Sequence, residues 1–275
     1  MSVRAQTSPG KTTPKPDKSL GQHWLRDEAV LSAIADCAEV VSGDTVLEIG
    51  PGLGTLTRVL AARAGRVLAV EFDPDLAARL SREFAESKSV EIIPGDFLRF
   101  DLSRLPAGYK VAANIPYYIT NPIIMQLLSA RNKPCVAALL VQREVAERLA
   151  AKPGAMSILA VAAQFHAEVS LGPVVPARLF TPPPKVDSQV VILRPRPSGR
   201  DLSPDQEKLF FRIVKAGFSA RRKKLRTALS GGLNTPVAEA EILLHTAGIN
   251  PNLRAQDLTI EDWCEIMQSF DNIVG

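Results

Sequence analysis

The residues with the clearest chemical potential are Asn114, Ile115, Pro116 and Tyr117, which directly follow the apolar run 111–113. That run predicts a buried strand, so the tetrapeptide should lie at a strand end. The exocyclic amine of a nucleobase is a poor nucleophile, because its lone pair is delocalised into the ring. The side-chain carbonyl of Asn114 and the backbone carbonyl of Ile115 could accept hydrogen bonds from such an amine, while Tyr117 stacks on a flipped base. The structural alternative is a strand-ending turn with a core tyrosine.

A second constellation begins with a glycine-rich loop after the expected strand 45–49. Gly50, Gly52 and Gly54 are spaced G-x-G-x-G, whereas dinucleotide binders carry G-x-G-x-x-G. Glu71 ends the next expected strand and Asp96 with Phe97 follows the third.

These positions predict one adenosine-binding site. Glu71 can accept from two ribose hydroxyls, and Asp96 from an adenine amino group with Phe97 covering the ring. The carboxyl ends of parallel strands lie at one edge of an open sheet, where ligands bind. S-adenosyl-L-methionine and NAD are both candidates. The glycine spacing disfavours NAD, and the tetrapeptide 114–117 offers nothing to a hydride transfer.

Strands and helices are expected to alternate along most of the chain. The pattern predicts strands at 45–49, 66–72, 90–93, 110–113 and 135–141, with helices at 55–64, 74–86, 122–130, 143–151 and 156–166. This alternation is typical of a doubly wound α/β sheet with helices on both faces. The strands expected at 168–175 and 188–193 have no helix between them, so we expect an antiparallel pair at one edge.

Composition shifts divide the chain into three parts. Residues 1–18 are rich in Pro, Thr and Lys and are expected to be a disordered basic tail. Residues 19–197 should form the catalytic domain. The Pro-Arg-Pro-Ser-Gly segment at 195–199 marks the expected domain boundary. Residues 198–275, which follow it, are expected to form helices at 205–218, 221–229, 237–247 and 260–270.

Charge and cysteine usage limit the class of protein. Among the 275 residues the net charge is +4, and the stretch 212–226 contains seven Lys or Arg and no acid. This favours a polyanionic partner. The three cysteines are far apart, so we expect neither a disulfide framework nor a zinc site, and a reducing cytosol is the natural compartment. No signal peptide and no membrane span are predicted.

These motifs together resemble the KsgA/Dim-type rRNA adenine dimethyltransferases, from about Lys18 to the C-terminus. The resemblance is carried by segment 19–25, the glycine loop, Glu71, Asp96, segment 114–117 and segment 180–188. It implies a Rossmann-like methyltransferase sheet that uses S-adenosyl-L-methionine, with a helical rRNA-binding domain at the C-terminus. The implied reaction dimethylates N6 of two adjacent adenosines in the 3′-terminal hairpin of 16S rRNA, within the 30S subunit or its precursor. We expect a monomer in the cytoplasm.

The resemblance also implies roles for individual residues. Gln22, His23, Leu25 and Gly52 should contact the cofactor, and Gly50 should approach its methionine part. Asn114 should lie near both the cofactor and the target amine. The family usually has Asn-Phe where this chain has His23-Trp24. His23 could therefore contact the cofactor through its backbone or through its side chain, and both possibilities remain open. Phe180 is expected to clamp the flipped adenine against Tyr117, with a core aromatic as the alternative. The rRNA phosphates are expected to be bound by a basic cluster that consists of Arg221, Arg222, Lys223, Lys224 and Arg226.

Three other functions remain open from the sequence. A large-subunit rRNA methyltransferase of the antibiotic-resistance type shares the catalytic motif, although the Phe-Thr-Pro-Pro-Pro-Lys run at 180–185 favours the small-subunit enzyme. A DNA adenine methyltransferase usually carries Asp-Pro-Pro-Tyr at this position. A ribosome-assembly checkpoint factor is compatible with catalysis and would bind immature small subunits.

Overall fold

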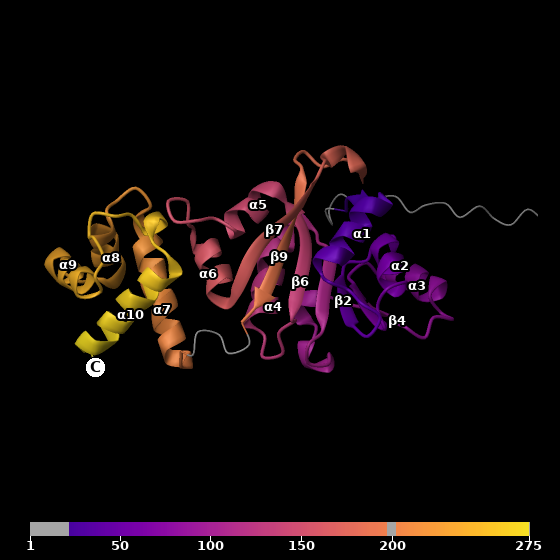
Figure 1. Ribbon diagram of the computed structural model, residues 1–275, viewed down its shortest axis with the longest axis horizontal. Helices are drawn as coiled ribbons and strands as arrows, with labels where there is room; N and C mark the ends of the chain where they lie inside the picture. Colours follow the sequence, from indigo (N-terminus) through magenta and orange to yellow (C-terminus); the bar gives the residue numbers. More distant parts are fainter. Residues whose placement is uncertain (1–21, 197–201, 275) are drawn as a thin grey trace, which may run out of the picture.

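A seven-stranded sheet forms the centre of the protein (Figure 1), in the order β4-β3-β2-β5-β6-β9-β7. The computed structural model describes residues 22–196 and 202–274, so the expected tail and part of the expected domain boundary lie outside the described residues. The five strands from β4 to β6 are parallel, while β9 runs antiparallel to both β6 and β7. The predicted doubly wound sheet with an antiparallel pair at one edge is therefore confirmed. The strands are β2 (Thr45–Ile49), β3 (Arg66–Glu71), β4 (Val90–Pro94), β5 (Lys110–Asn114), β6 (Val136–Gln142), β7 (Ala167–Val175) and β9 (Ser188–Pro195).

Helices cover both faces of this sheet. On one face, α1 and α2 bury Leu31, Ile34 and Leu60 against Val46 and Ala112. On the other face, α4, α5 and α6 pack their apolar sides against the same strands. The central strands β2, β3, β5 and β6 are thereby buried on both sides, which explains their nearly continuous apolar sequences. These helices are α1 (Glu28–Cys37), α2 (Thr55–Ala61), α3 (Pro74–Glu83), α4 (Thr120–Ser129), α5 (Arg143–Leu149) and α6 (Ile158–His166).

A second, two-stranded sheet joins distant parts of the chain. Strand β1 (Trp24–Leu25) pairs antiparallel with β8 (Phe180–Thr181), so that Trp24 faces Thr181 and Leu25 faces Phe180. The sequence did not predict this pairing. It ties the segment before α1 to the loop that precedes β9.

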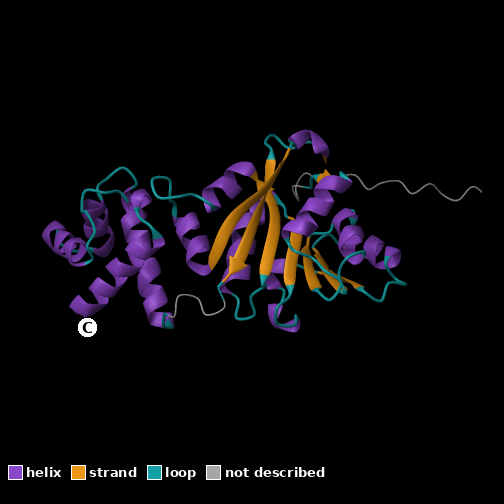
Figure 2. Cartoon of the chain, viewed as in Figure 1, coloured by secondary structure: helices purple, strands orange, loops and turns teal. Residues whose placement is uncertain are grey.

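The C-terminal part forms a cluster of helices at one end of the molecule, clear of the strands (Figure 2). It consists of α7 (Pro204–Gly217), α8 (Leu225–Leu233), α9 (Val237–Thr246) and α10 (Ile260–Val274). Trp263 is fully buried in its core, directly over Gly217, where a Cβ atom would lie 2.4 Å from the indole ring. Phe165 of α6 belongs to this core, so α6 packs on the sheet with one side and on the helical domain with the other.

The helix predicted from residue 221 begins later, at Leu225. Residues 221–224 form a turn between the 3₁₀ helix at 218–220 and α8. The backbone N–H of Leu225 donates to the carbonyl of Leu253 at 2.7 Å, and that of Arg226 donates to Pro251. The loop 250–253 thus satisfies donors that are otherwise free at a helix N-terminus, and so fixes where α8 starts.

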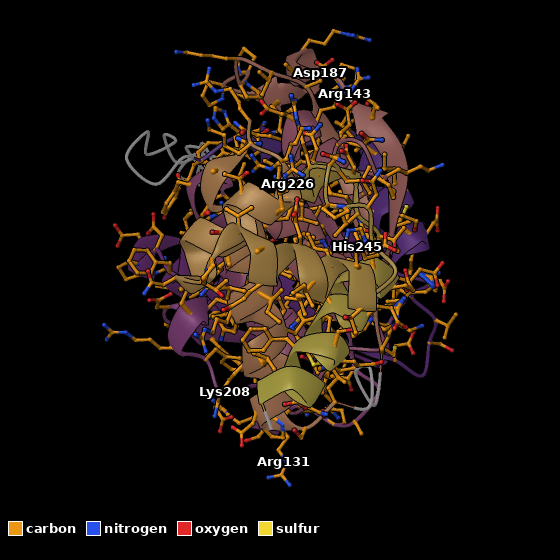
Figure 3. All side chains as sticks on the ribbon, turned by 90° about the vertical axis from the view of Figure 1, so that its left-hand side faces the viewer. Arg131, Arg143, Asp187, Lys208, Arg226 and His245 are labelled. Atoms are coloured by element: carbon orange, nitrogen blue, oxygen red, sulfur yellow. The ribbon has the colours of Figure 1, made fainter. Side chains whose placement is uncertain are left out.

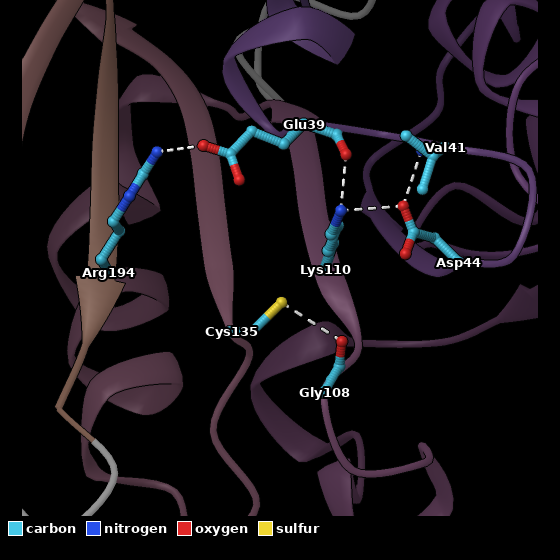
Figure 4. Close-up of polar contacts among 7 residues, drawn as sticks. All are labelled: Glu39, Val41, Asp44, Gly108, Lys110, Cys135 and Arg194. Carbon is cyan, nitrogen blue, oxygen red and sulfur yellow. Dashed lines mark hydrogen bonds and ion pairs between the residues drawn. The ribbon is translucent and has the colours of Figure 1, made fainter.

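The sheet end opposite the glycine loop is held by ion pairs (Figure 4). The Nζ atom of Lys110 lies 2.9 Å from Oδ2 of Asp44 and also donates to the backbone carbonyl of Glu39. The Glu39 carboxylate pairs with Arg194 on β9. These contacts fasten the first residue of β5 and the loop after α1, which leaves the carboxyl ends of the strands as the open edge. No helix in the described part of the chain is long and apolar enough to cross a membrane.

Candidate active site

One cavity lies at the carboxyl ends of β2, β3, β4 and β5. It brings together eleven of the twelve residues that the sequence singled out for cofactor binding or catalysis. These lining residues are Gln22, His23, Leu25, Gly50, Gly52, Glu71, Asp96, Phe97, Asn114, Ile115 and Tyr117. The strands that carry them are adjacent in the sheet, as the parallel topology requires.

The glycine loop turns tightly above β2. Gly50, Gly52 and Gly54 all have positive φ angles, of 67°, 56° and 75°. Such angles are strained for residues with a Cβ atom, which explains the three glycines. The indole ring of Trp24 packs beside Gly52, 3.8 Å from where a Cβ atom would lie.

Glu71 is buried at the end of β3, and its carboxylate is held in a fixed orientation. Oε2 accepts from the Gly52 backbone N–H at 2.8 Å, and Oε1 accepts from the Asp73 backbone N–H at 2.9 Å. Burial raises the pKa of Glu71, and the two backbone donors oppose that rise. A carboxylate oxygen has two lone pairs, so each oxygen can accept a further hydrogen bond from a hydroxyl in the cavity.

The adjoining part of the cavity combines a carboxylate with aromatic surface. Asp96 accepts from the Leu98 backbone N–H at 2.9 Å and caps the short helix that follows β4. Phe97 is only 4% exposed, whereas Phe72 is 59% exposed although it lines the same cavity. An exposed aromatic ring beside a polar acceptor suits a flat heterocycle that carries an amino group.

The segment before α1 forms a wall of the cavity. The ring nitrogen Nδ1 of His23 lies 2.7 Å from the carbonyl oxygen of Pro182, so Nδ1 carries the hydrogen. The Leu25 carbonyl accepts from the Thr55 hydroxyl at 2.9 Å, and Gln22 donates to Asp73. The wall is thus fastened to the loop after β8, to α2 and to the start of α3.

Asn114 ends β5, and its side chain contacts this wall. Its Nδ2 donates to the backbone carbonyl of His23 at 3.3 Å. That bond fixes the orientation of the amide, and Oδ1, which is its only acceptor atom, can accept a hydrogen bond in the cavity. The backbone of His23, rather than its ring, is therefore what touches Asn114.

Tyr117 is held from two sides. Its hydroxyl lies 2.7 Å from the Ser188 hydroxyl at the start of β9, and its ring stacks on His23 with 5.7 Å between centroids. Burial raises the pKa of Tyr117, so the phenol stays protonated at neutral pH. The ring is consequently fixed, with one face covered by His23.

Phe180 is the one predicted catalytic residue that does not line the cavity. It is 3% exposed and packs with Leu25, Leu31 and Val175 in the core beneath α1. The expected clamp of a base between Tyr117 and Phe180 is not formed in this structure, because the pairing of β8 with β1 turns the Phe180 ring into that core. Its position matches the core-aromatic alternative.

The basic cluster divides into free and paired side chains. Arg221, Arg222 and Lys223 are exposed, and the described part of the chain offers them no ion-pair partner. Lys224 donates to Asn252 at 2.8 Å, and Arg226 pairs with Glu241 on α9. Figure 3 shows Arg226 over the helical domain, whereas Lys208 and Arg131 project outward at one edge of that view.

Sequence reasoning assigned no role to four further lining residues. Phe72 and Tyr118 directly follow predicted site residues, and their aromatic character was the available signal. Trp24 and Glu48 are buried, yet Trp24 Nε1 and Glu48 Oε2 have no hydrogen-bond partner among the described residues. An acid within the apolar strand 45–49 was the signal for Glu48.

The chain is similar to rRNA methyltransferases over most of its length. The family model described as ribosomal RNA adenine dimethylase matches residues 14–272. Ribosomal RNA small subunit methyltransferase A of Moorella thermoacetica is 42% identical over 272 residues, which cover 94% of this chain and 93% of that relative. A crystal structure of a dimethyladenosine transferase from Plasmodium falciparum has a TM-score of 0.80 and 26% identity, covering 91% of this chain and 98% of that one. The 23S rRNA methyltransferase ErmE has a TM-score of 0.74 and 30% identity, covering 90% and 99% of the two chains.

Proposed function

The chain belongs to the ribosomal RNA adenine dimethylase family, and on that premise we propose that it dimethylates N6 of two adjacent adenosines in 16S rRNA. The observation that carries the proposal is the convergence of Asn114, Ile115 and Tyr117 with Glu71 and Asp96 on one cavity. The small-subunit substrate is supported by the relative from Moorella thermoacetica, which is named for it. The target lies in the 3′-terminal hairpin, and the 30S subunit or its precursor is the partner that we expect a cytoplasmic monomer to bind.

The residues present fit S-adenosyl-L-methionine, which is the methyl donor. Two residues that line this cavity, Trp24 and Glu48, each carry a buried polar atom, Nε1 and Oε2, that lacks a partner among the described residues. When bound, the donor supplies a methyl group on a positively charged sulfur, which a nitrogen lone pair can attack directly. Glu71 would hold the ribose hydroxyls. Asp96 would accept from the adenine amine beside Phe72 and Phe97, and the open backbone at Gly50 would admit the methionine part.

Asn114 and Ile115 would activate the target amine. Oδ1 of Asn114 and the carbonyl of Ile115 would each accept a hydrogen bond from one N–H group of the amine, which would favour a tetrahedral nitrogen whose lone pair is free to attack. The bond from Asn114 Nδ2 to the His23 carbonyl supports this role, because it fixes the orientation of the amide that carries Oδ1. Positioning of this kind can supply ~7–11 kcal/mol of barrier reduction. The acceptors also stabilise the charge that develops on the amine. The methylated amine then loses a proton to water, so no general base is required.

Tyr117 would provide the platform for the flipped base. Its ring is fixed by the Ser188 hydroxyl and by His23, so a base can stack on it without ordering a mobile side chain. Phe180 would act indirectly, by holding β8 against β1 and thus keeping His23 in place.

The exposed charges of Arg221, Arg222 and Lys223 would bind rRNA phosphates. Their turn is exposed, and phosphate contacts of this kind make affinity strongly salt-dependent. Lys224 and Arg226 would contribute less, because each already bonds to a neighbouring side chain.

The proposal is tested by incubating the protein with radiolabelled S-adenosyl-L-methionine and unmethylated small subunits, then mapping the label by nucleotide. We expect two adjacent dimethylated adenosines near the 3′ end of 16S rRNA. Large subunits in a parallel reaction are the matched control, since ErmE, which is similar in fold, is a 23S rRNA methyltransferase. Label in 23S rRNA alone, or in neither RNA, would overturn the proposal.

A further inference from the structure

Tyr118 lies where the catalytic cavity opens to solvent. Its side chain is 60% exposed, although it lines the same cavity as Tyr117 and Asn114. Among the described residues its hydroxyl has no hydrogen-bond partner, and its ring contacts no other aromatic ring. Tyr117, directly before it in the chain, is held by Ser188 and His23. One of these adjacent tyrosines is thus fixed within the protein, whereas the other is free to contact a ligand.

The backbone that carries Tyr118 is rigid, so the fold sets the direction of its Cα–Cβ bond. Residues 117–119 form a 3₁₀ helix, which the Ile119 N–H closes by donating to the Pro116 carbonyl at 3.3 Å. Thr120, the first residue of α4, is 2% exposed and anchors the end of this turn. A 3₁₀ helix has three residues per turn, so neighbouring side chains point about 120° apart. Tyr118 therefore offers a second aromatic surface at the cavity, in a direction different from that of the preceding residue.

The proposed substrate needs two such surfaces. Its two target adenosines are adjacent, and a nucleotide that flips into the cavity leaves the base stack of its neighbours. The neighbouring base then has one uncovered face, and the RNA backbone holds it close to the cavity mouth. Unpaired RNA bases are commonly bound by stacking on aromatic side chains. The described lining residues include no Lys or Arg, so the cavity mouth offers this nucleotide an aromatic face rather than a charge for its phosphate.

We infer that Tyr118 stacks on the base next to the flipped adenine and thereby favours a target with a neighbouring purine. The inference rests on the proposed function and extends recognition from one nucleotide to two. Tyr117 binds the base that reacts, whereas Tyr118 binds the base beside it. Purines have the larger ring system and stack more strongly than pyrimidines, so a neighbouring adenine is preferred. Because Tyr118 lies on one side of the flipped base, its partner is the other target adenosine in one of the two methylation reactions.

The first experiment measures methyl transfer to unmethylated small subunits by Tyr118→Ala and Tyr118→Phe. We expect kcat/KM for the subunits to fall by ~5- to 150-fold in Tyr118→Ala, which is the cost of one base–aromatic stack. Tyr118→Phe retains the ring and should stay within about twofold of the wild type. Val41→Ala is the matched control, because Val41 is also 60% exposed but lies at the sheet end opposite the cavity. Equal losses in Tyr118→Ala and Tyr118→Phe would overturn the inference, since the hydroxyl would then be the group that matters.

Calorimetry separates this role from one in which Tyr118 covers the cofactor. Tyr118→Ala should bind S-adenosyl-L-homocysteine with the affinity of the wild type, because the ring contacts the RNA alone. A loss of this affinity as large as the loss in kcat/KM would place Tyr118 in the cofactor site and would overturn the inference.

The decisive test changes the neighbouring base itself. Two kinds of small subunit are reconstituted, each with uridine in place of one of the two target adenosines, so that each keeps a single target. For the wild-type protein, one of these replacements should lower kcat/KM at the remaining adenosine by about tenfold. The same replacement should cost Tyr118→Ala less than about twofold, since this variant has already lost the stack. A cost that is equal in the two proteins for both kinds of subunit would contradict the inference.

The outcomes distinguish this inference from the proposed function. A wild-type protein that methylates neither adenosine would refute the proposed function, and the inference with it. Dimethylation by Tyr118→Ala at the kcat/KM of the wild type would refute the inference alone.

Discussion

The buried acid on β2 predicts that Glu48→Gln will stabilise the protein in a way that depends on pH. The ordinary pKa of 4.5 applies to Glu48 in the unfolded chain, whereas burial raises the folded value to about 8. Between these values the unfolded state has lost the proton and the folded state retains it. Raising the pH therefore favours unfolding, and the two values give a loss of about 3 kcal/mol between pH 4 and pH 7.

Glutamine does not titrate, so the variant should escape this loss. We expect the free energies of unfolding of variant and wild type to differ by a constant amount below pH 4. The difference should then change in favour of Glu48→Gln by about 3 kcal/mol up to pH 7 and level off above pH 8. Glu71, whose pKa burial also raises, is present in both proteins, so its contribution largely cancels in the difference.

The assay is urea denaturation of the cofactor-free protein at several pH values, followed by tryptophan fluorescence. Trp24 lies in the cavity wall and Trp263 in the helical core, so Trp263→Phe in both backgrounds isolates the signal of the catalytic domain. Glu91→Gln, at a half-exposed carboxylate on β4 that pairs with Arg66, serves as the control. A change smaller than about 1 kcal/mol between pH 4 and pH 7 would show that Glu48 is ionised in the folded protein and would refute the reasoning.

Three further predictions concern catalysis, packing and RNA binding. Asn114→Ala should reduce methyl transfer by more than ~100-fold, while cofactor binding stays measurable by calorimetry. The control is Asn121→Ala, on the exposed side of α4. Near-normal turnover of Asn114→Ala would contradict the role of the amide. Phe180→Ala should lower the free energy of unfolding by ~3–5 kcal/mol in urea titrations, because the ring is buried beneath α1. A loss of methyl transfer without a loss of stability would instead support the clamp of the base between Phe180 and Tyr117. Arg222→Glu combined with Lys223→Glu should weaken binding to small subunits and lower the slope of log affinity against log salt by ~1–2 units; an unchanged slope in filter-binding assays would exclude this turn as the docking surface.

Much of the catalytic core could be predicted from the sequence, because its signals are local. The apolar strands, the glycines with positive φ and the acids at strand ends each occupy positions that a parallel sheet brings to one edge. The parallel direction of the strands from β2 to β6 follows from the alternation of strands and helices. The site residues at the strand ends could therefore be predicted from these local signals, whereas Gln22, His23 and Leu25 were implied only by the resemblance to a known family.

The features that escaped prediction depend on distant partners. A strand of two residues such as Trp24–Leu25 has no periodicity, and it exists because residues 180–181 pair with it. That same pairing turns Phe180 away from the cavity. The start of α8 is set by carbonyls of the loop 250–253, whereas the run of basic side chains before it reads as helix. The neutral state of Glu48 likewise depends on the apolar residues around it, which come from three separate elements.

The pairing of His23 with Pro182 has a consequence for the order of events during protein synthesis. The polypeptide leaves the ribosome from its N-terminus, so residues 22–25 emerge early, but the contact of His23 with Pro182 and the pairing of β1 with β8 cannot form until residue 182 has followed. By then β2 to β7 are already available, while β9, which lies between β6 and β7, is still missing. Affinity for the methyl donor should therefore arise late in translation, at about the same chain length that completes the sheet.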